Sequence, residues 1–277
     1  MNFKGITLLC ILLSGVAFGQ NTTPDHDFKS PRKSRLYFYW GWNRGAYSRS
    51  DLHFSGEGYN FTLKKAVAKD RQSPFEIKTY LNPVNVTIPQ YNFRVGYYLN
   101  DRWDLSFGAD HMKYVMQQDQ EVHITGYIHD THSGYDRDYT DNTIVLTEDF
   151  LQFEHTDGLN YLNVEIRHTD PLFSFNKIQI DLIEGLGAGA LIPRTNTTLL
   201  NKERYDQFHL SGYGVDMIVA GRISFFNAFF IQTEAKGGFI NLPDIRTTQF
   251  ESDRARQSFF FSQVNIVFGG IINLSRK

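Results

Sequence analysis

The sequence predicts an all-β fold, an eight-stranded antiparallel β-barrel that spans a membrane. Segments with alternating apolar and polar residues recur eight times, as half-buried strands do. Long and short connections alternate between them, as in a transmembrane barrel with short periplasmic turns and long extracellular loops. The polar face of the segments carries charges of both signs among glycines. That composition suits a narrow interior in which each charge needs a partner.

The N-terminus has the pattern of an export signal. Lys4 precedes an apolar run, Ile6–Phe18, and small residues follow it. The run is too short to cross a bilayer as a helix. We therefore expect residues 1–20 to be a signal peptide and residues 21–34 to be a periplasmic segment. The only cysteine, Cys10, lies inside the signal, so the exported chain is expected to contain none.

The barrel is expected over residues 35–277. The first strand, 35–44, alternates tryptophan and leucine with tyrosine, glycine and asparagine, and a polar stretch, 46–88, follows as a long surface loop. Next comes "YNFRVGYYLNDRWDLSFGAD", 91–110, in which two alternating runs flank the polar turn Asn100-Asp101-Arg102. Alternation on both sides of a short polar turn predicts a β-hairpin.

The middle of the barrel repeats this arrangement. A second long loop, 118–158, is expected to protrude as a hairpin, because "QEVHITGYI" and "NTIVLTEDFLQF" both alternate. The fourth strand, 159–168, sets leucine, valine and isoleucine against asparagine, glutamate and arginine. The short turn "TDPLFSFN" then introduces the fifth strand, 177–191, which has glycines on its polar face.

Three strands complete the predicted ring. After the loop "IPRTNTTLLNKERYD", strand 207–225 alternates throughout, and the tight turn Phe226-Asn227 leads into strand 228–238. A last loop, 239–256, precedes the final strand, 257–274. All four long connections then fall at one end of the barrel and all three short ones at the other.

Alternation alone does not say which face points inward. A soluble lipocalin-like barrel has its apolar face inside, whereas a membrane barrel has it outside. Aromatic residues stand near strand ends, where a girdle at the membrane surface belongs: Trp40, Trp42, Tyr97, Trp103 and Phe229. We therefore predict that the apolar face contacts lipid. A secreted soluble barrel that carries an apolar ligand is the alternative.

Charge and barrel size restrict the function. The net charge of −2 gives no electrostatic basis for nucleic-acid binding. An eight-stranded barrel is only wide enough for its own side chains, so a water-filled pore is not expected. Three roles remain: surface structure, binding through the loops, and catalysis at the lipid-facing wall. No cofactor is expected.

The predicted strands resemble the small eight-stranded outer-membrane barrels typified by the membrane domain of OmpA and by OmpX. The resemblance covers residues 35–274 and is most specific in "GGIINL", where Gly269, Ile272 and Leu274 resemble the assembly signal of a final strand. The chain departs from that signal in having aliphatic residues where an aromatic is usual. "GLGAGALIPRTN" also resembles barrels of Bacteroidota. The resemblance implies an outer-membrane location, with membrane lipids including lipopolysaccharide as partners.

The loops are the first candidate site. His129, His132, Asp136 and Asp138 gather in the second long loop and are predicted to bind an extracellular ligand that the sequence does not identify. They match neither zinc-ligand spacing nor a calcium-binding loop, so no metal site is predicted. A hydrated loop tip without a ligand is the alternative. The expected role is thus non-enzymatic, either structural or loop-mediated binding.

The catalytic alternative involves "FHLSGYG". His209 and Ser211 are two residues apart in an expected strand, so both should project from its lipid-facing side. The pair resembles the His-x-Ser of outer-membrane lipid A deacylases, which implies His209 as general base and Ser211 as nucleophile. The chain departs from that family in having Gly212 beside the serine and no acid after Asp216 in this strand to hold the histidine, while Glu234 of the next strand has inward parity. Ordinary wall residues are the competing interpretation.

Glu184 breaks the pattern. Unbroken alternation turns its carboxylate toward lipid, where a charge is costly. A β-bulge near Ile183 would turn it inward, and we predict such a bulge. Without one, Glu184 becomes a functional candidate.

Overall fold

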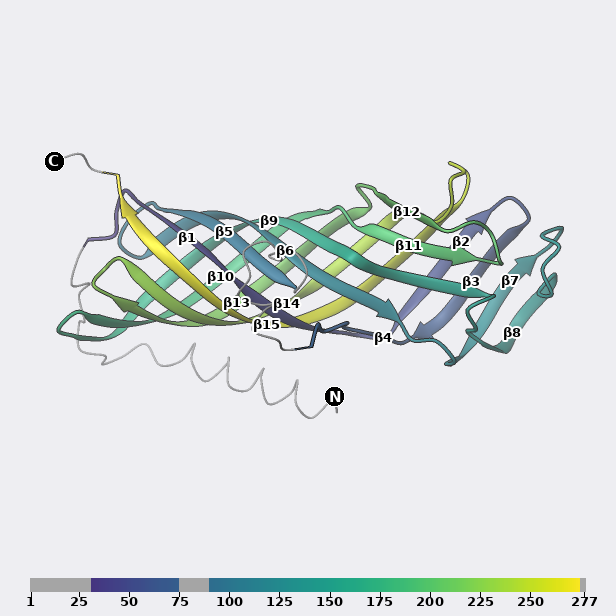
Figure 1. Ribbon diagram of the computed structural model, residues 1–277, viewed down its shortest axis with the longest axis horizontal. Helices are drawn as coiled ribbons and strands as arrows, with labels where there is room; N and C mark the ends of the chain where they lie inside the picture. Colours follow the sequence, from purple (N-terminus) through teal and green to yellow (C-terminus); the bar gives the residue numbers. More distant parts are fainter. Residues whose placement is uncertain (1–30, 75–89, 275–277) are drawn as a thin grey trace.

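Eight antiparallel strands close on themselves in the computed structural model, which describes residues 31–74 and 90–274 (Figure 1). The expected signal peptide and most of the expected periplasmic segment lie outside these residues. Each strand pairs with the next around the ring, and the last pairs with the first. The ring consists of β1 (Arg35–Tyr47), β5 (Tyr91–Tyr98), β6 (Trp103–Met116), β9 (Leu151–Phe175), β10 (Ile178–Leu191), β13 (Gly212–Phe225), β14 (Phe229–Arg246) and β15 (Arg254–Asn273).

The register fixes the shape of the ring. Stepping from partner to partner through all eight strands, a path that starts at Leu36 returns to β1 at Ala46, ten residues further along. With about 3.3 Å per residue and about 4.8 Å between strands, this offset tilts the strands by roughly 40°. Such a tilt is typical of transmembrane barrels.

The outer face of the ring is apolar and the inner face is polar, as predicted. In the hairpin of β5 and β6, Val95 and Phe107 are 37% and 52% exposed, whereas Arg94 and Asp104 are almost completely buried. The same alternation continues through β9, β13 and β15. An apolar band around a charged lumen is the reverse of a soluble barrel, so this fold is a membrane barrel.

The first long loop differs from expectation, because it contains strands. Residues 46–74 continue β1 and then form β2 (Ser50–Gly56), β3 (Tyr59–Ala66) and the short β4 (Ala68–Lys69). The remainder of the expected loop lies outside the described residues. Within the second loop, β7 (Glu121–Ile128) and β8 (Arg137–Val145) form a hairpin, as expected, but its second strand begins before the segment "NTIVLTEDFLQF" and ends within it, and the last residues of that segment belong to β9.

β2, β3, β7 and β8 extend the barrel wall beyond the membrane, and we call these four strands the crown (Figure 1). β2 pairs with the outer end of β15, and the order continues through β3, β7 and β8. The inward residues of the crown are apolar, for example Phe54 and Phe61, whose rings stack 5.3 Å apart between centroids. They share one apolar core with the outer ends of β9, β14 and β15.

Several strand boundaries differ from prediction, and β14 runs to Arg246, eight residues into the loop expected over 239–256. β9 begins eight residues earlier than expected, at Leu151, and runs through the expected turn to Phe175. The expected strand 207–225 is divided: β12 (Tyr205–Phe208) pairs with β11 (Arg194–Leu199), and β13 begins only at Gly212.

The bulge predicted at Ile183 is not there. β10 pairs with β13 without a shift, and its one irregularity against β9 leaves Leu172 of β9 as the extra residue. Glu184 therefore keeps the parity of its neighbours and is exposed on the outer face.

Candidate functional site

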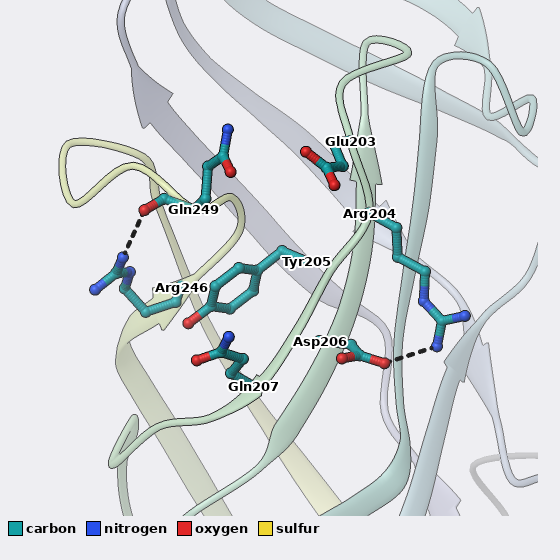
Figure 2. Close-up of a pocket in the computed structure, with 7 residues that line it drawn as sticks. All are labelled: Glu203, Arg204, Tyr205, Asp206, Gln207, Arg246 and Gln249. Atoms are coloured by element: carbon teal, nitrogen blue, oxygen red, sulfur yellow. Dashed lines mark hydrogen bonds and ion pairs between the residues drawn. The ribbon is translucent and has the colours of Figure 1, made fainter.

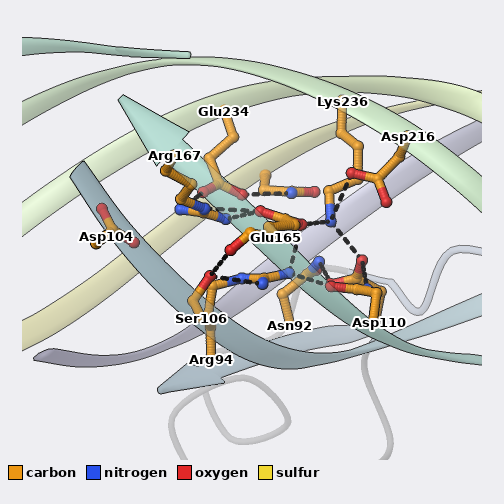
Figure 3. A network of polar contacts seen from close by, with 12 residues as sticks. Asn92, Arg94, Asp104, Ser106, Asp110, Glu165, Arg167, Asp216, Glu234 and Lys236 are labelled. Carbon is orange, nitrogen blue, oxygen red and sulfur yellow. Dashed lines mark hydrogen bonds and ion pairs between the residues drawn. The ribbon is translucent and has the colours of Figure 1, made fainter. Parts of the chain in front are cut away.

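The lumen is filled by a network of charged side chains centred on Glu165 of β9 (Figure 3). Its carboxylate lies 2.5 Å from the guanidinium of Arg94, 2.6 Å from that of Arg167 and 2.8 Å from Nζ of Lys236. All four side chains are fully buried. A carboxylate held by three cations is stabilised strongly enough to stay ionised away from water.

Further acids complete the network. Lys236 donates to Asp110 at 2.6 Å, and Arg167 donates to Glu234 at 3.1 Å (Figure 3). Toward the periplasmic end, Tyr37 donates to Asp104 at 2.7 Å. Cations and anions therefore alternate across the lumen, which leaves it packed with side chains, as expected for a barrel of this size.

Above the charged network the interior becomes apolar. His155 of β9 lies at this transition, fully buried beside Phe153 and Tyr114, and its Nδ1 is 2.9 Å from the hydroxyl of Thr195. Nε2 has no hydrogen-bond partner within the described residues. Burial lowers the pKa of His155 to about 3, so the imidazole is neutral.

A polar pocket of about 330 Å³ opens at the extracellular rim (Figure 2). One side is β12 with the two residues before it, and the other is the end of β14 with the loop that follows it. The pocket is lined by Glu203, Arg204, Tyr205, Asp206, Gln207, Arg246 and Gln249.

Contacts between lining residues hold the pocket in shape (Figure 2). The guanidinium of Arg246 donates to the backbone carbonyl of Gln249 at 3.2 Å and lies 5.7 Å from the ring centroid of Tyr205. Arg204 donates to Asp206 at 3.0 Å. Tyr205 therefore presents a ring held beside a cation, with carboxylates and amides around it.

His209 lies immediately beyond this pocket, two residues after Gln207. Its Nε2 is 2.8 Å from Oδ2 of Asp244, whose other oxygen accepts from Nε of Arg254 at 2.6 Å. Partial burial acts to raise the pKa of Asp244, but the hydrogen bond from His209 and the charge of Arg254 lower it below its ordinary value. Asp244 is therefore the acid beside His209 that could not be identified from the sequence.

Ser211 does not face lipid, contrary to prediction. It lies in the break between β12 and β13, is 1% exposed, and its hydroxyl donates to the backbone carbonyl of His209 at 3.3 Å. The break ends the alternation that was expected to align the two side chains. His209 is partly exposed and its ring is directed to Asp244.

The predicted loop residues lie at the tip of the β7–β8 hairpin. His129 pairs with Asp138 at 3.0 Å, and Asp136 accepts from the backbone N–H groups of Thr131 and His132, both at 3.1 Å. These contacts shape the turn itself. No group of three or more histidine, cysteine or acidic residues in the described ranges is placed to hold a metal.

Sequence reasoning missed the rim pocket. Its two sides lie about forty residues apart, and "NKERYDQ" reads only as a polar loop. The register of the hairpin formed by β13 and β14 could have shown that Asp244 lies near His209. Counting pairs outward from the turn that joins Phe225 to Phe229 brings Asp244 beside the 209–211 segment.

The lumen, the apolar band and the extracellular loops together define the fold as an outer-membrane β-barrel. Across the described residues no helix has the length and apolarity to span a membrane. No protein-family model and no curated protein matches the chain.

Among solved structures, the chain is similar to the outer membrane protein OprG from Pseudomonas aeruginosa. The identity is 10% and the TM-score 0.43, over 89% of this chain and all of the other. The attachment invasion locus protein Ail of Yersinia pestis is 8% identical with a TM-score of 0.28, over 85% and 99% of the chains. The outer membrane protease OmpT from Escherichia coli is 6% identical with a TM-score of 0.24, over 88% and 99%.

Proposed function

We propose that this protein is a non-porin barrel of the outer membrane whose rim pocket binds a hydroxyl-rich ligand such as a saccharide. The observation that carries this proposal is the lining of the pocket, which combines one aromatic ring with charged and amide side chains only. The resemblance of the strand pattern to OmpA and OmpX, of the final strand to an assembly signal, and of "GLGAGALIPRTN" to Bacteroidota barrels supports the assignment to the outer membrane. The lipid partners include lipopolysaccharide, whose sugars surround the extracellular rim.

The chemistry of the lining matches a sugar. Sugar hydroxyls both donate and accept hydrogen bonds, and the carboxylates of Glu203 and Asp206 with the amides of Gln207 and Gln249 offer both functions. The ring of Tyr205 offers a flat apolar face for the C–H side of a sugar. The apolar core beneath the crown supports the rim, so the pocket is preorganised.

Binding is tested with the purified protein in detergent and the core oligosaccharide released from lipopolysaccharide by mild acid. Saturation-transfer NMR should show contact with the native protein and with Tyr127→Ala, which removes an exposed tyrosine from the outer side of the crown. Tyr205→Ala should bind at least tenfold more weakly, because it removes the ring and its contact with Arg246. Equal binding by the two variants, or none by the native protein, would contradict the proposal.

The loop tip gives a second place for the same kind of binding. His129, His132, Asp136 and Asp138 form a polar turn at the tip of the β7–β8 hairpin. An Asp138→Asn variant that weakens oligosaccharide contact while Tyr205→Ala does not would move the site to the tip.

A lipid A deacylase-like hydrolase is the second candidate function, favoured by the His209–Asp244 pair at 2.8 Å. The position of the Ser211 hydroxyl against a backbone carbonyl opposes it. Mass spectra of lipid A from cells that make the native protein and its His209→Ala form should be identical under the binding proposal. Loss of one acyl chain with the native protein alone would identify an enzyme.

A further inference from the structure

A carboxylate lies on the lipid-facing wall. Glu184 is exposed on β10 between the outward residues Leu182 and Leu186. Asp170 of β9, opposite Leu182 and nearer the periplasmic turn, pairs with Arg102, so Glu184 lies on the membrane side of this pair and within the apolar band. Within the described part of the chain its carboxylate makes no hydrogen bond or ion pair. An ionisable group at such depth usually serves a function.

His168 of β9 is the residue directly opposite Glu184. Its ring does not pair with the carboxylate and lies against Trp103 of β6, with 4.7 Å between the ring centroids and 56° between the ring planes. Nδ1 lies 3.4 Å from Asp170, which fixes the ring. Nε2 makes no hydrogen bond to any described residue. Two polar groups on adjacent strands are thus both left open toward the membrane.

We propose that the wall formed by β9 and β10 binds a second copy of this chain, with Glu184 of each copy paired to His168 of the other. A two-fold axis along the membrane normal, passing between β9 and β10, places each residue opposite its complement. The two lie on one ladder rung, and a tilt of roughly 40° separates them in depth by only about 3 Å. The interface is self-complementary, as a symmetric dimer requires.

The paired groups suit a site without water. A carboxyl and an imidazole Nε2 share one proton in each pair. The pair is then either two neutral groups or an ion pair, so it adds no unpaired charge to the membrane interior. Leu186 and Ile166 flank the pairs and are 62% and 45% exposed in the single chain. These side chains would shield the pairs from lipid. Hydrogen bonds between chains commonly stabilise association within membranes.

A lipid head group fits this place less well than a second copy. Head groups lie at the membrane surface, where Arg102 and Asp170 already pair with each other at 2.7 Å. Glu184 and His168 lie deeper, beside apolar side chains. The partner must therefore bring both an acid and an imidazole at this same depth, and a second copy of the chain does so.

Disulfide cross-linking in native membranes tests the proposal. Leu186→Cys is made in a Cys10→Ser background, so that it is the only cysteine. Ile266→Cys on β15, outward-facing and 49% exposed on the far side of the ring, is the matched control. We expect a cross-linked dimer from Leu186→Cys at a yield at least tenfold above that from Ile266→Cys. Equal yields, or no dimer from Leu186→Cys, would overturn the proposal.

The pairing of Glu184 with His168 is tested by replacing each residue and by exchanging the two. In the Leu186→Cys chain, Glu184→Leu should reduce the dimer at least tenfold, although leucine suits lipid well and the barrel should fold. Glu184→His alone and His168→Glu alone should also fail, whereas the two together restore complementary pairs and the dimer. Gel mobility of unboiled samples confirms folding of each variant. A dimer that survives Glu184→Leu in a folded barrel would refute the role of these residues.

Discussion

Replacing Glu165 with glutamine should strongly destabilise the barrel, because it leaves one buried cation without an acid. Lys236 would keep Asp110 and Arg167 would keep Glu234. Arg94 would keep only neutral partners, namely Tyr39, Ser106 and Asn163. A buried charge that loses its partner costs about 3–5 kcal/mol, so we expect Glu165→Gln to lower the free energy of unfolding by about 4 kcal/mol.

Guanidinium unfolding in detergent micelles measures this difference. The three tryptophans all lie in the barrel wall, so their fluorescence follows the ring, and the mobility of unboiled samples gives a second measure. Glu121→Gln, on the exposed side of the crown, is the control and should change stability by less than about 0.5 kcal/mol. The double variant Arg94→Met, Glu165→Gln should lose about 2 kcal/mol less than the two single losses together, because neither charge is then stranded.

A loss below about 1 kcal/mol for Glu165→Gln would refute this reasoning. It would mean that water reaches Arg94 and replaces the lost carboxylate. The lumen would then be hydrated and the description of a closed interior would be wrong.

Three further predictions follow from the lumen and the crown. The neutral imidazole of His155 should make the crown acid-sensitive. This histidine binds a proton below about pH 6.5 in the unfolded chain but only near pH 3 in the folded chain. The free energy of unfolding should therefore fall by up to about 1.4 kcal/mol for each unit by which the pH is lowered between these values. His155→Phe should flatten that dependence in limited proteolysis of the crown, and an unchanged slope would contradict it. Gly96→Val should cost about 2 kcal/mol in guanidinium unfolding, because a Cβ there would lie 2.1 Å from the ring of Tyr37, which donates to Asp104. The native protein in planar bilayers should show no steady conductance, and porin-like steps would disprove a filled lumen.

The ring could be predicted from the sequence because strand periodicity is local. Each of the eight segments carries its own alternation, and the identity of its polar residues, such as Arg94 and Glu165, indicates the lumen. The crown could not be predicted in the same way. Phe54 and Phe61 alternate correctly, but β2 finds its partner at the far end of the chain, on β15.

The candidate site was predictable only in part. His209 was identified, but its partner Asp244 depends on the register of the β13–β14 hairpin. Ser211 was misplaced because a strand break leaves no mark in the alternation of residues 207–225. Glu184 shows the opposite case. Unbroken alternation correctly placed it on the outer face, whereas the bulge predicted to turn it inward is not found.

Whole-cell labelling tests most directly that the crown and the rim pocket face the outside. Gly134→Cys places a thiol at the tip of the β7–β8 hairpin, where a Cβ would meet nothing within 4 Å, and Lys177→Cys places one in the short β9–β10 turn. In a Cys10→Ser background, a maleimide that does not cross membranes should label residue 134 on intact cells and residue 177 only after lysis. Labelling of residue 177 on intact cells, with residue 134 protected, would invert the barrel and place the pocket in the periplasm.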